Sequence, residues 1–404
     1  MNTSYGSMLG LLLVFVMQSA PLCAQDSGNS FALRGARVHT AAGPPIENGT
    51  VIVENGKIAA VGSAIRIPSG VQVVDVEGKT VIPGLIDEHS HLGTYDFGDV
   101  NEFTEPIGPE HRALDALHME VRDWYEAVKG GVTTIVTGPG SGERMGGQSI
   151  TIKTFGENLE QRILKESREL KMAINARNMS HIPTIRSTFL KAREYMEKWD
   201  EYEAGDKEGP PPSRDLRLEA IVPVLRGEEK VRCHIHYAND MIAFLRLKDE
   251  FGFDLTFIHS SEAYKVADEI ARRDVAVIVL PLATRIGVTD DLLFGNTQLY
   301  EAGVRMSLHT DHPVVHQKLL RLNAGLAIRY GLPEDYALRT VTMNPAISSR
   351  IDDRVGSIEV GKDADLVVLD GTWYEPSTRV DIVFVDGVRA FDRANERSGL
   401  EEEN

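Results

Sequence analysis

The sequence predicts an α/β protein in which a (β/α)8 barrel of the TIM type lies beside a smaller sheet built from both ends of the chain. Three observations predict it. The chain has 404 residues, more than the ~250–300 residues at which a single core usually stops growing. Short apolar segments alternate with helical stretches through about 265 central residues. Both ends carry alternating apolar and polar residues separated by turn residues, a pattern typical of β-strands.

The composition is that of an ordinary globular protein, with 42% hydrophobic and 25% charged residues. It excludes collagen-like, low-complexity and disordered classes. The net charge is −17, from 43 basic and 60 acidic residues. Because affinity for nucleic acid comes largely from Lys and Arg neutralising phosphates, we expect no nucleic-acid partner.

The first two dozen residues predict a signal peptide, and hence export to the periplasm or secretion. Residues 1–24 contain no charged side chain, and 8–17 is an apolar run too short to span a bilayer. Signal-peptidase cleavage fits after Ala24, although no basic residue precedes the run and Leu22 is large for its position. Because of Cys23, the exported protein could be a lipoprotein or a soluble protein. The alternative to a signal peptide is a buried N-terminal segment. Nothing else is long and apolar enough to insert stably in a membrane.

The two ends of the mature chain share one texture. In residues 25–82 short strands are separated by Asn55-Gly56 and Glu77-Gly78, which favour hairpin turns. Near the other end, GSIEVGKDADLVVLDG and VDIVFVDGVRAF repeat the alternation. We predict that 25–82 pairs with 348–404, which ends in an acidic tail, and that 83–347 forms the barrel. The eight predicted barrel strands are VIPGLID, GVTTIVTG, SITIKT, KMAINAR, VRCHIH, DLTFIHS, VAVIVLPL and VRMSLHT.

Histidines stand where these predicted strands end. In an H-x-H pair, alternate residues point the same way, so two imidazoles converge on one point. Active sites of such barrels lie at the C-terminal ends of the strands, so we expect all of these side chains at one rim. Imidazole and carboxylate are ligands that suit zinc, with an open position for water. The candidates are His89, His91, His234, His236, His259 and Asp311.

Together these motifs resemble the amidohydrolase superfamily, with imidazolonepropionase and related amidohydrolases as the nearest branch. The resemblance is carried by VIPGLIDEHSH, the strand-end histidines, LHTDHP, VTMNPA and GSIEVGKDADLVVLD, and covers about residues 31–390. It implies a metal-dependent hydrolase barrel with a composite β-sandwich formed by the N- and C-terminal segments. Barrels of this superfamily often form homo-oligomers. A homo-oligomer is therefore expected from the resemblance, although no residue in the sequence indicates it.

The resemblance also implies roles for single positions. Asp311 matches the residue of the eighth strand that touches the metal and shuttles the proton. His236 could exchange roles with His234 or contact the substrate, and we favour His234 as the ligand. The implied metal ligands are His89, His91, His234, His259 and Asp311, and the candidates for substrate binding are His236, Gln148 and Tyr264.

Lys153 is a further candidate ligand, because many superfamily members bridge two metals with a carboxylated lysine, usually after the fourth strand. Others use a glutamate after the third. Lys153 lies in GGQSITIKT, which is the third strand or an inserted hairpin. An exposed lysine on an edge strand is the alternative, and a single zinc would then be simpler. The preceding loop, GPGSGERMGG, lacks the GK[ST] of a phosphate-binding loop, and we interpret it as a mobile active-site loop.

The predicted reaction is hydrolysis of a C–N bond in an amide, a cyclic amide or a dipeptide, by attack of a metal-bound hydroxide with Asp311 as proton shuttle. The substrate would be a small molecule or a dipeptide. The same site could serve a lactonase, an esterase or a heterocycle deaminase, and fold-level resemblance does not decide between them. A non-catalytic metal-binding barrel is a further alternative, against which Asp311 argues because a pure binder needs no proton shuttle.

Overall fold

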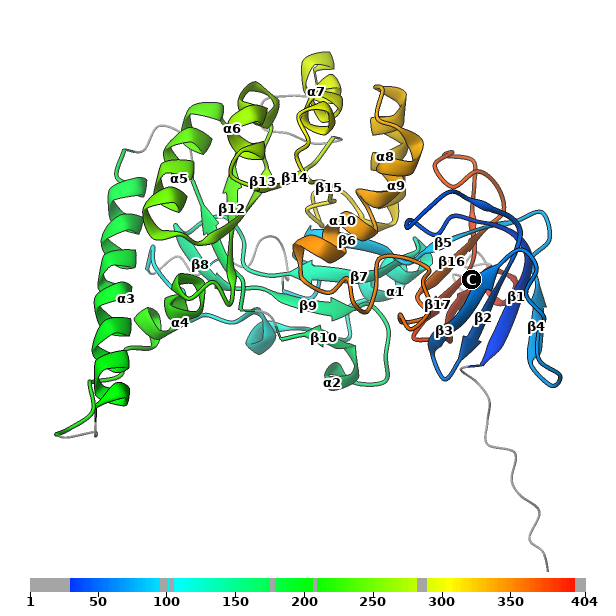
Figure 1. Ribbon diagram of the computed structural model, residues 1–404, viewed down its shortest axis with the longest axis horizontal. Helices are drawn as coiled ribbons and strands as arrows, with labels where there is room; N and C mark the ends of the chain where they lie inside the picture. Colours follow the sequence, from blue (N-terminus) through cyan, green and yellow to red (C-terminus); the bar gives the residue numbers. More distant parts are fainter. Residues whose placement is uncertain are drawn as a thin grey trace, which may run out of the picture.

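The computed structural model describes residues 30–94, 101, 105–166, 168–174, 179–205, 209–281 and 289–396. The predicted signal peptide and acidic tail lie outside these ranges. Figure 1 shows an α/β portion, with helices arranged in an arc around its strands, beside a separate sheet in the colours of both chain ends. Mixed α/β content of this kind fits a TIM-barrel-type fold.

The separate sheet has eight strands and combines both ends of the chain. Its order is β18-β17-β16-β5-β1-β2-β3, with β4 paired to β1. The ends meet where β5 and β16 pair antiparallel, with Val81 opposite Val368. Phe31 and Phe384 stack at 4.3 Å in its own hydrophobic cluster. The strands are β1 (Phe31–Val38), β2 (Ile46–Glu54), β3 (Lys57–Gly62), β4 (Gln72–Asp75), β5 (Thr80–Pro83), β16 (Leu366–Leu369), β17 (Val380–Val385) and β18 (Val388–Asp392).

Each of the eight predicted barrel segments contains a strand, and VIPGLID contains two. Gly84 separates them, and a Cβ there would lie 2.1 Å from Thr133 Oγ1, so only glycine fits between the terminal sheet and the α/β portion. One α/β sheet has the order β10-β9-β7-β6 and the other β15-β14-β13-β12-β11-β8. Their strands are β6 (Leu85–Ser90), β7 (Val132–Thr137), β8 (Met145–Gln148), β9 (Ile150–Lys153), β10 (Ile163–Lys165), β11 (Leu170–Ala173), β12 (Lys230–Ile235), β13 (Asp254–His259), β14 (Ala276–Val279) and β15 (Met306–Leu308).

The third predicted strand departs from the parallel arrangement of a (β/α)8 barrel. β9 runs antiparallel to β7, and β8 runs antiparallel to β11. A loop rather than a helix joins β7 to β8. From β11 to β15 all neighbours are parallel, as predicted.

The helices begin and end at residues suited to those positions. Asp215 caps α4 by accepting from the Arg217 and Leu218 amides, and Gly252 ends α5 in the left-handed conformation. The helices are α1 (Asp123–Lys129), α2 (Leu159–Arg162), α3 (His181–Ala204), α4 (Leu216–Leu225), α5 (Ala238–Phe251), α6 (Ala267–Ala271), α7 (Asp290–Glu301), α8 (Leu320–Arg329), α9 (Glu334–Arg339) and α10 (Met343–Ser348). Short 3₁₀ turns are η1 (Ala113–Ala116), η2 (Ala263–Val266), η3 (Gln317–Leu319) and η4 (Arg393–Asn395).

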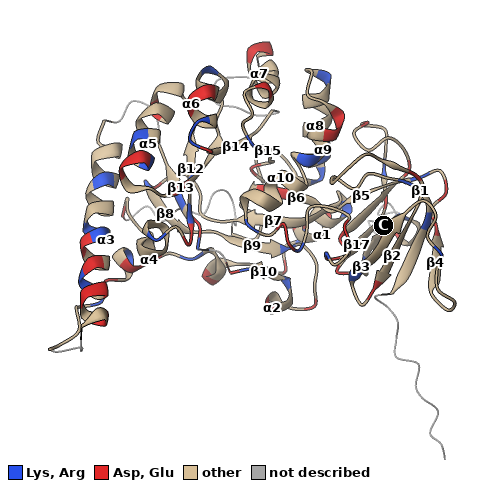
Figure 2. Cartoon of the chain, in the orientation of Figure 1, with Lys and Arg blue, Asp and Glu red and all other residues tan. Residues whose placement is uncertain are grey.

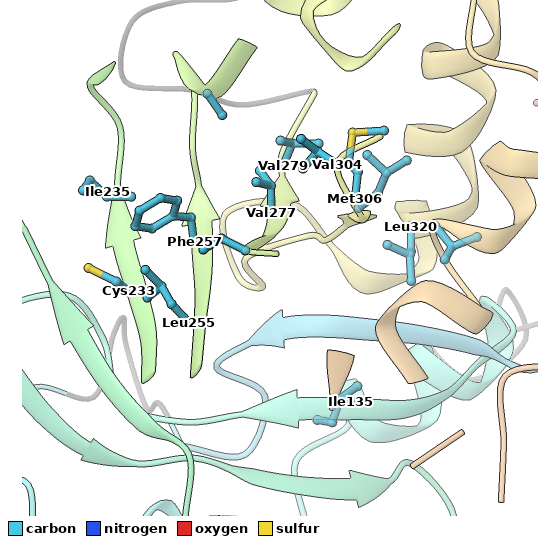
Figure 3. Close-up of a cluster of buried hydrophobic side chains, with 14 of the residues drawn as sticks. Ile135, Cys233, Ile235, Leu255, Phe257, Val277, Val279, Val304, Met306 and Leu320 are labelled. Atoms are coloured by element: carbon cyan, nitrogen blue, oxygen red, sulfur yellow. The ribbon is translucent and has the colours of Figure 1, made fainter. Parts of the chain in front are cut away.

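The main core lies between the strands and the helices. Alternate residues of neighbouring strands, such as Cys233, Phe257 and Val277, contribute to it (Figure 3). Phe257 meets Phe244 of α5 at 6.2 Å. The intervening residue Arg232 is also buried, and its Nη1 lies 2.8 Å from Glu169 Oε2. The other strand face is therefore polar and charged.

Acidic and basic residues are interspersed along α3, α5 and α6 (Figure 2). Among the described residues, no helix combines the length and the apolarity needed to cross a bilayer.

His39, which directly follows β1, is expected to make stability depend on pH. Burial and, secondly, Arg37 lower the pKa of His39 to about 4, whereas an unfolded histidine protonates near 6.5. Between these values the unfolded state binds the extra proton, so the free energy of unfolding falls as the pH is lowered from 6.5 to 4. His39→Gln should make this fall shallower in denaturant unfolding measured across that range. An unchanged slope would show that native His39 takes up its proton as the unfolded chain does.

Candidate metal centre

The carboxylate of Asp311 lies among the predicted strand-end histidines. Its Oδ1 is 3.2 Å from His89 Nε2 and 3.3 Å from His91 Nε2. Its Oδ2 is 3.8 Å from His259 Nε2. The two oxygens therefore face different imidazoles: Oδ1 faces His89 and His91, and Oδ2 faces His259.

His309 is a member of this group that the sequence analysis did not single out. His259, His309 and Asp311 offer ligand atoms that all lie within 4.8 Å of one another, as do His89, His91 and Asp311. His309 stands two residues before Asp311, so the alternation that identified the H-x-H pairs could have identified it.

An unusual backbone conformation brings His259 to the group. By strand alternation it would share a face with Leu255 and Phe257, which belong to the main hydrophobic cluster. Instead His259 has φ of 67°, and the following Ser260 has φ of 46°. Side chains other than glycine rarely adopt this region, so the chain turns sharply where its histidine is needed.

Other contacts orient individual rings. His91 Nδ1 lies 2.8 Å from the Gly138 carbonyl oxygen. Because a carbonyl only accepts, Nδ1 carries the proton and Nε2 faces Asp311. His234 Nδ1 lies 2.9 Å from Ser141 Oγ, and the His234 ring is centred 4.4 Å from that of His259.

The second member of the other H-x-H pair, His236, also lies in this region. Its Nδ1 is 2.9 Å from Ser261 Oγ, and its ring is centred 5.1 Å from that of His259. All five strand-end histidines that the sequence indicated thus lie around Asp311 or around His259.

The protonation states suit metal coordination. Burial lowers the pKa values of His89 and His259 well below the usual histidine value, and for His89 the Lys171 ammonium adds to the effect. Burial lowers the pKa of His309 to about 4. Burial opposes ionisation of Asp311, but His259 and His89 hold the pKa of its carboxyl well below its usual value. Neutral imidazoles around an ionised carboxylate are what a divalent ion requires.

The donor set fits a divalent metal. His309 Nε2 is buried and lacks a hydrogen-bond partner among the described residues, while His309 Nδ1 lies 3.4 Å from the His89 carbonyl oxygen. Such an imidazole lone pair is a normal metal ligand. Imidazole nitrogens with a shared carboxylate are ligands of zinc and of neighbouring divalent transition metals.

Lys153 lies elsewhere, and its contacts contradict the predicted bridging role. Its Nζ is 2.8 Å from Asp363 Oδ2, 3.0 Å from Asp365 Oδ1 and 2.5 Å from Asp386 Oδ1. Burial acts against its charge, yet these three carboxylates raise its pKa above the usual lysine value. Carboxylation would replace the ammonium with a further negative charge among three aspartates. The exposed-lysine alternative is also wrong, because the Lys153 side chain is 1% exposed.

A different lysine approaches the histidine group. Lys171, on β11, donates from Nζ to the Pro139 and Gly140 carbonyl oxygens and to Ser141 Oγ, each at 3.1 Å. Ser141 in turn contacts His234. Lys171 is the first residue of the fourth predicted strand, and this position is the signal from which the sequence could have identified it as a residue near the site. Its contacts fasten the loop that precedes β8 beside the site.

The two other substrate-binding candidates have different positions. Gln148, on β8, donates from Nε2 to the Pro109 carbonyl oxygen at 3.0 Å, so its amide is held by the backbone of the segment that precedes η1. Tyr264 lines a pocket that also includes His259.

Comparisons with known proteins identify amidohydrolases among the similar proteins. The model of the amidohydrolase family matches residues 295–390. The crystal structure of an amidohydrolase from Thermotoga maritima MSB8 is 34% identical, covers 90% of this chain and 100% of its own, and superimposes with a TM-score of 0.83.

Curated relatives are more distant. An imidazolonepropionase from Geobacillus sp. (strain WCH70) is 26% identical over 379 residues, which are 80% of this chain and 84% of the relative. The amidohydrolase tasK of Hapsidospora irregularis is 27% identical over 85% of this chain, but the match spans only 40% of that longer protein.

The match to the Thermotoga structure extends over that entire protein at 34% identity. On this evidence the chain belongs to the amidohydrolase superfamily.

Proposed function

We propose that this protein is a zinc-dependent hydrolase that cleaves the C–N bond of a small amide, a cyclic amide or a dipeptide. The observation that carries the proposal is the position of Asp311, an ionised and largely buried carboxylate whose two oxygens face imidazoles on both sides. A carboxylate in this place can hold metal and move a proton.

When bound, a divalent ion polarises the scissile carbonyl and lowers the pKa of a water ligand. His89, His91, His259, His309 and Asp311 would hold it, with His234 beside them. Asp311 accepts the proton of the attacking water as the oxygen joins the carbonyl carbon. It then donates that proton to the leaving nitrogen as the C–N bond breaks. The Gly138 carbonyl keeps the His91 ring in the correct tautomer throughout.

We also propose that the two α/β sheets are parts of one (β/α)8 barrel. β8 and β9 are separated only by Ser149, so the chain itself joins the sheets on one side. On the other, the His91 amide donates to the His312 carbonyl at 3.0 Å and the Asp311 amide to the His89 carbonyl at 3.2 Å. The same contacts bring the ends of β6 and β15 together at the metal ligands.

The test is a substrate panel on zinc-loaded protein. Because residues 1–24 predict export, the panel begins with dipeptides and N-acyl amides available outside the cell, followed by cyclic amides, lactones and heterocyclic amines. Release of a free amine from a dipeptide or amide supports the proposal. Turnover confined to lactones, or ammonia release confined to heterocycles, would refute C–N hydrolysis of amides and identify a lactonase or a deaminase.

Removal of metal is expected to abolish activity reversibly. After dialysis against a chelator, turnover should fall at least about 100-fold, because both carbonyl polarisation and water activation are lost. Added zinc should restore it and raise the melting temperature, since an ion at 100 times its dissociation constant stabilises a folded protein by about 2.7 kcal/mol. His89→Ala should not recover, whereas the exposed-site control His118→Ala should. Full activity in metal-free protein would exclude this mechanism.

A further inference from the structure

A small pocket adjoins the metal centre on the side of His259. It is enclosed by the end of β13, the end of β14, the η2 turn and one face of α7. Its lining residues are His259, Ser260, Ser261, Tyr264, Val279, Leu280, Pro281, Leu292, Gly295, Asn296 and Leu299. We call it the Asn296 pocket.

The pocket wall depends on a close approach between Tyr264 and α7. A Cβ at Gly295 would lie 2.8 Å from Tyr264 Cδ1, so glycine lets the ring pack directly against the helix. Thr289 caps α7 by accepting from the Leu292 amide at 3.3 Å, which sets the start of the helix. The wall is thus shaped by particular residues and not left by loose packing.

Two buried polar groups of the pocket lack a hydrogen-bond partner in the part of the chain that the structure describes. Asn296 is 3% exposed and Ser260 is 2% exposed. Asn296 Nδ2 and Ser260 Oγ have no hydrogen-bond partner among the described residues. A buried donor without a partner is costly, so a group that supplies the missing hydrogen bonds is expected to bind here.

The size and charge of the pocket restrict that group. About 10 Å³ is open to the centre of a water molecule, which is room for roughly one water or one small substituent. Among the described residues, the lining contains no Asp, Glu, Lys or Arg, so none of these side chains would neutralise a charged substituent. Val279, Leu292 and Leu299 make the remainder apolar.

We propose that the Asn296 pocket is a substrate subsite that receives a small neutral hydroxyl-bearing substituent next to the scissile bond. Asn296 Nδ2 donates to the hydroxyl oxygen, and the hydroxyl donates to Ser260 Oγ. The position follows from His259, which lines the pocket and whose Nε2 is 3.8 Å from Asp311. This proposal rests on the proposed amide hydrolysis and narrows its substrate class to hydroxyl-bearing amides.

The test uses pairs of amides that differ only in hydroxyl against methyl. Glycolyl is compared with propionyl on the acyl side, and 2-hydroxyethyl with propyl on the amine side. In one of the pairs, kcat/KM is expected to be roughly tenfold higher for the hydroxyl member, a typical value for one neutral hydrogen bond. Asn296→Leu, which keeps the shape and removes the donor, should reduce that preference severalfold, because only the hydrogen bond to Ser260 Oγ remains. Equal rates within both pairs, or a preference that is undiminished in Asn296→Leu, would overturn the proposal.

A second variant tests the same pocket by enlargement. Leu292→Ala should raise the relative kcat/KM of a butyl-sized substituent at least about tenfold, because the volume of the removed side chain becomes available. Leu293→Ala is the matched control, since Leu293 is buried on the same helix but does not line the pocket. An equal gain in both variants, or in neither, would contradict the subsite.

Failure of the proposed function is distinguishable from failure of the subsite. If no amide is hydrolysed, binding of glycolamide and propionamide to zinc-loaded protein is measured by ligand-observed NMR. Tighter binding of glycolamide that is lost in Asn296→Leu would support the subsite although the reaction is another. Equal binding, or none, would overturn the subsite.

Discussion

Asp311→Asn is expected to lower kcat by about 10²–10⁴-fold when zinc is saturating, the usual contribution of a positioned general acid–base. The amide keeps the size of the carboxylate, and its oxygen can still face the imidazoles. It cannot take the proton from water or return it to the leaving nitrogen. Turnover is measured on the best amide of the panel, with the zinc content of each preparation determined in parallel.

The control for this variant is Asp274→Asn, because the Asp274 side chain is 89% exposed. It should keep wild-type turnover. If Asp311→Asn kept wild-type turnover with zinc bound, the proton-shuttle role would be wrong. If it failed to bind zinc at any attainable concentration, Asp311 would be needed as a ligand, and restoration of turnover by small carboxylic acids could then reveal a separate proton-transfer role.

Lys153→Ala is expected to destabilise the protein by about 3–5 kcal/mol, the cost of removing one partner from a buried ion pair. Asp363, Asp365 and Asp386 would lose their shared ammonium. Asp363 would retain Lys57 and Arg354, which limits the loss at that carboxylate. The measurement is denaturant unfolding of metal-free protein, with zinc content determined for each variant.

Lys165→Ala is the matched control on neighbouring β10. The Lys165 side chain is 26% exposed and its Nζ lies 4.0 Å from the single carboxylate of Glu229, so its loss should cost less than the loss of Lys153, which contacts three carboxylates. Zinc content should be unchanged in both variants. If Lys153→Ala lost zinc but kept wild-type stability, the result would instead support Lys153 as a metal ligand.

The candidate site was largely predictable because its signals are local. An H-x-H pair at the end of a strand requires only strand alternation, and His89, His91 and Asp311 do lie together. His259 was predicted from its place at a strand end, but the left-handed backbone that turns it toward the group was not. Asn296 could not be predicted, because α7 meets the end of β13 only in the folded chain.

The lysine prediction failed for a related reason. Lys153 and Lys171 both lie on predicted strands, and only sheet pairing decides which of them faces the histidines. β9 pairs antiparallel to β7, which places Lys153 against aspartates of the C-terminal segment. The alternation of strands and helices and the pairing of the two ends follow from composition and periodicity. Strand direction at β8 and β9 depends on long-range contacts that no window of sequence contains.

The pairing of β5 with β16 has a consequence for synthesis. Val81 and Val368 are partners about 290 positions apart in the chain. A ribosome adds about 5–20 residues per second, so β16 is synthesised on the order of 15–60 s after β5, and until then that edge of β5 is unpaired. An open strand edge is a template for pairing with other chains. The nascent chain therefore exposes an unpaired strand edge, prone to aggregation, through most of its translation. We expect the yield of folded protein to depend more on whether chaperones cover that edge than on the stability of the finished fold.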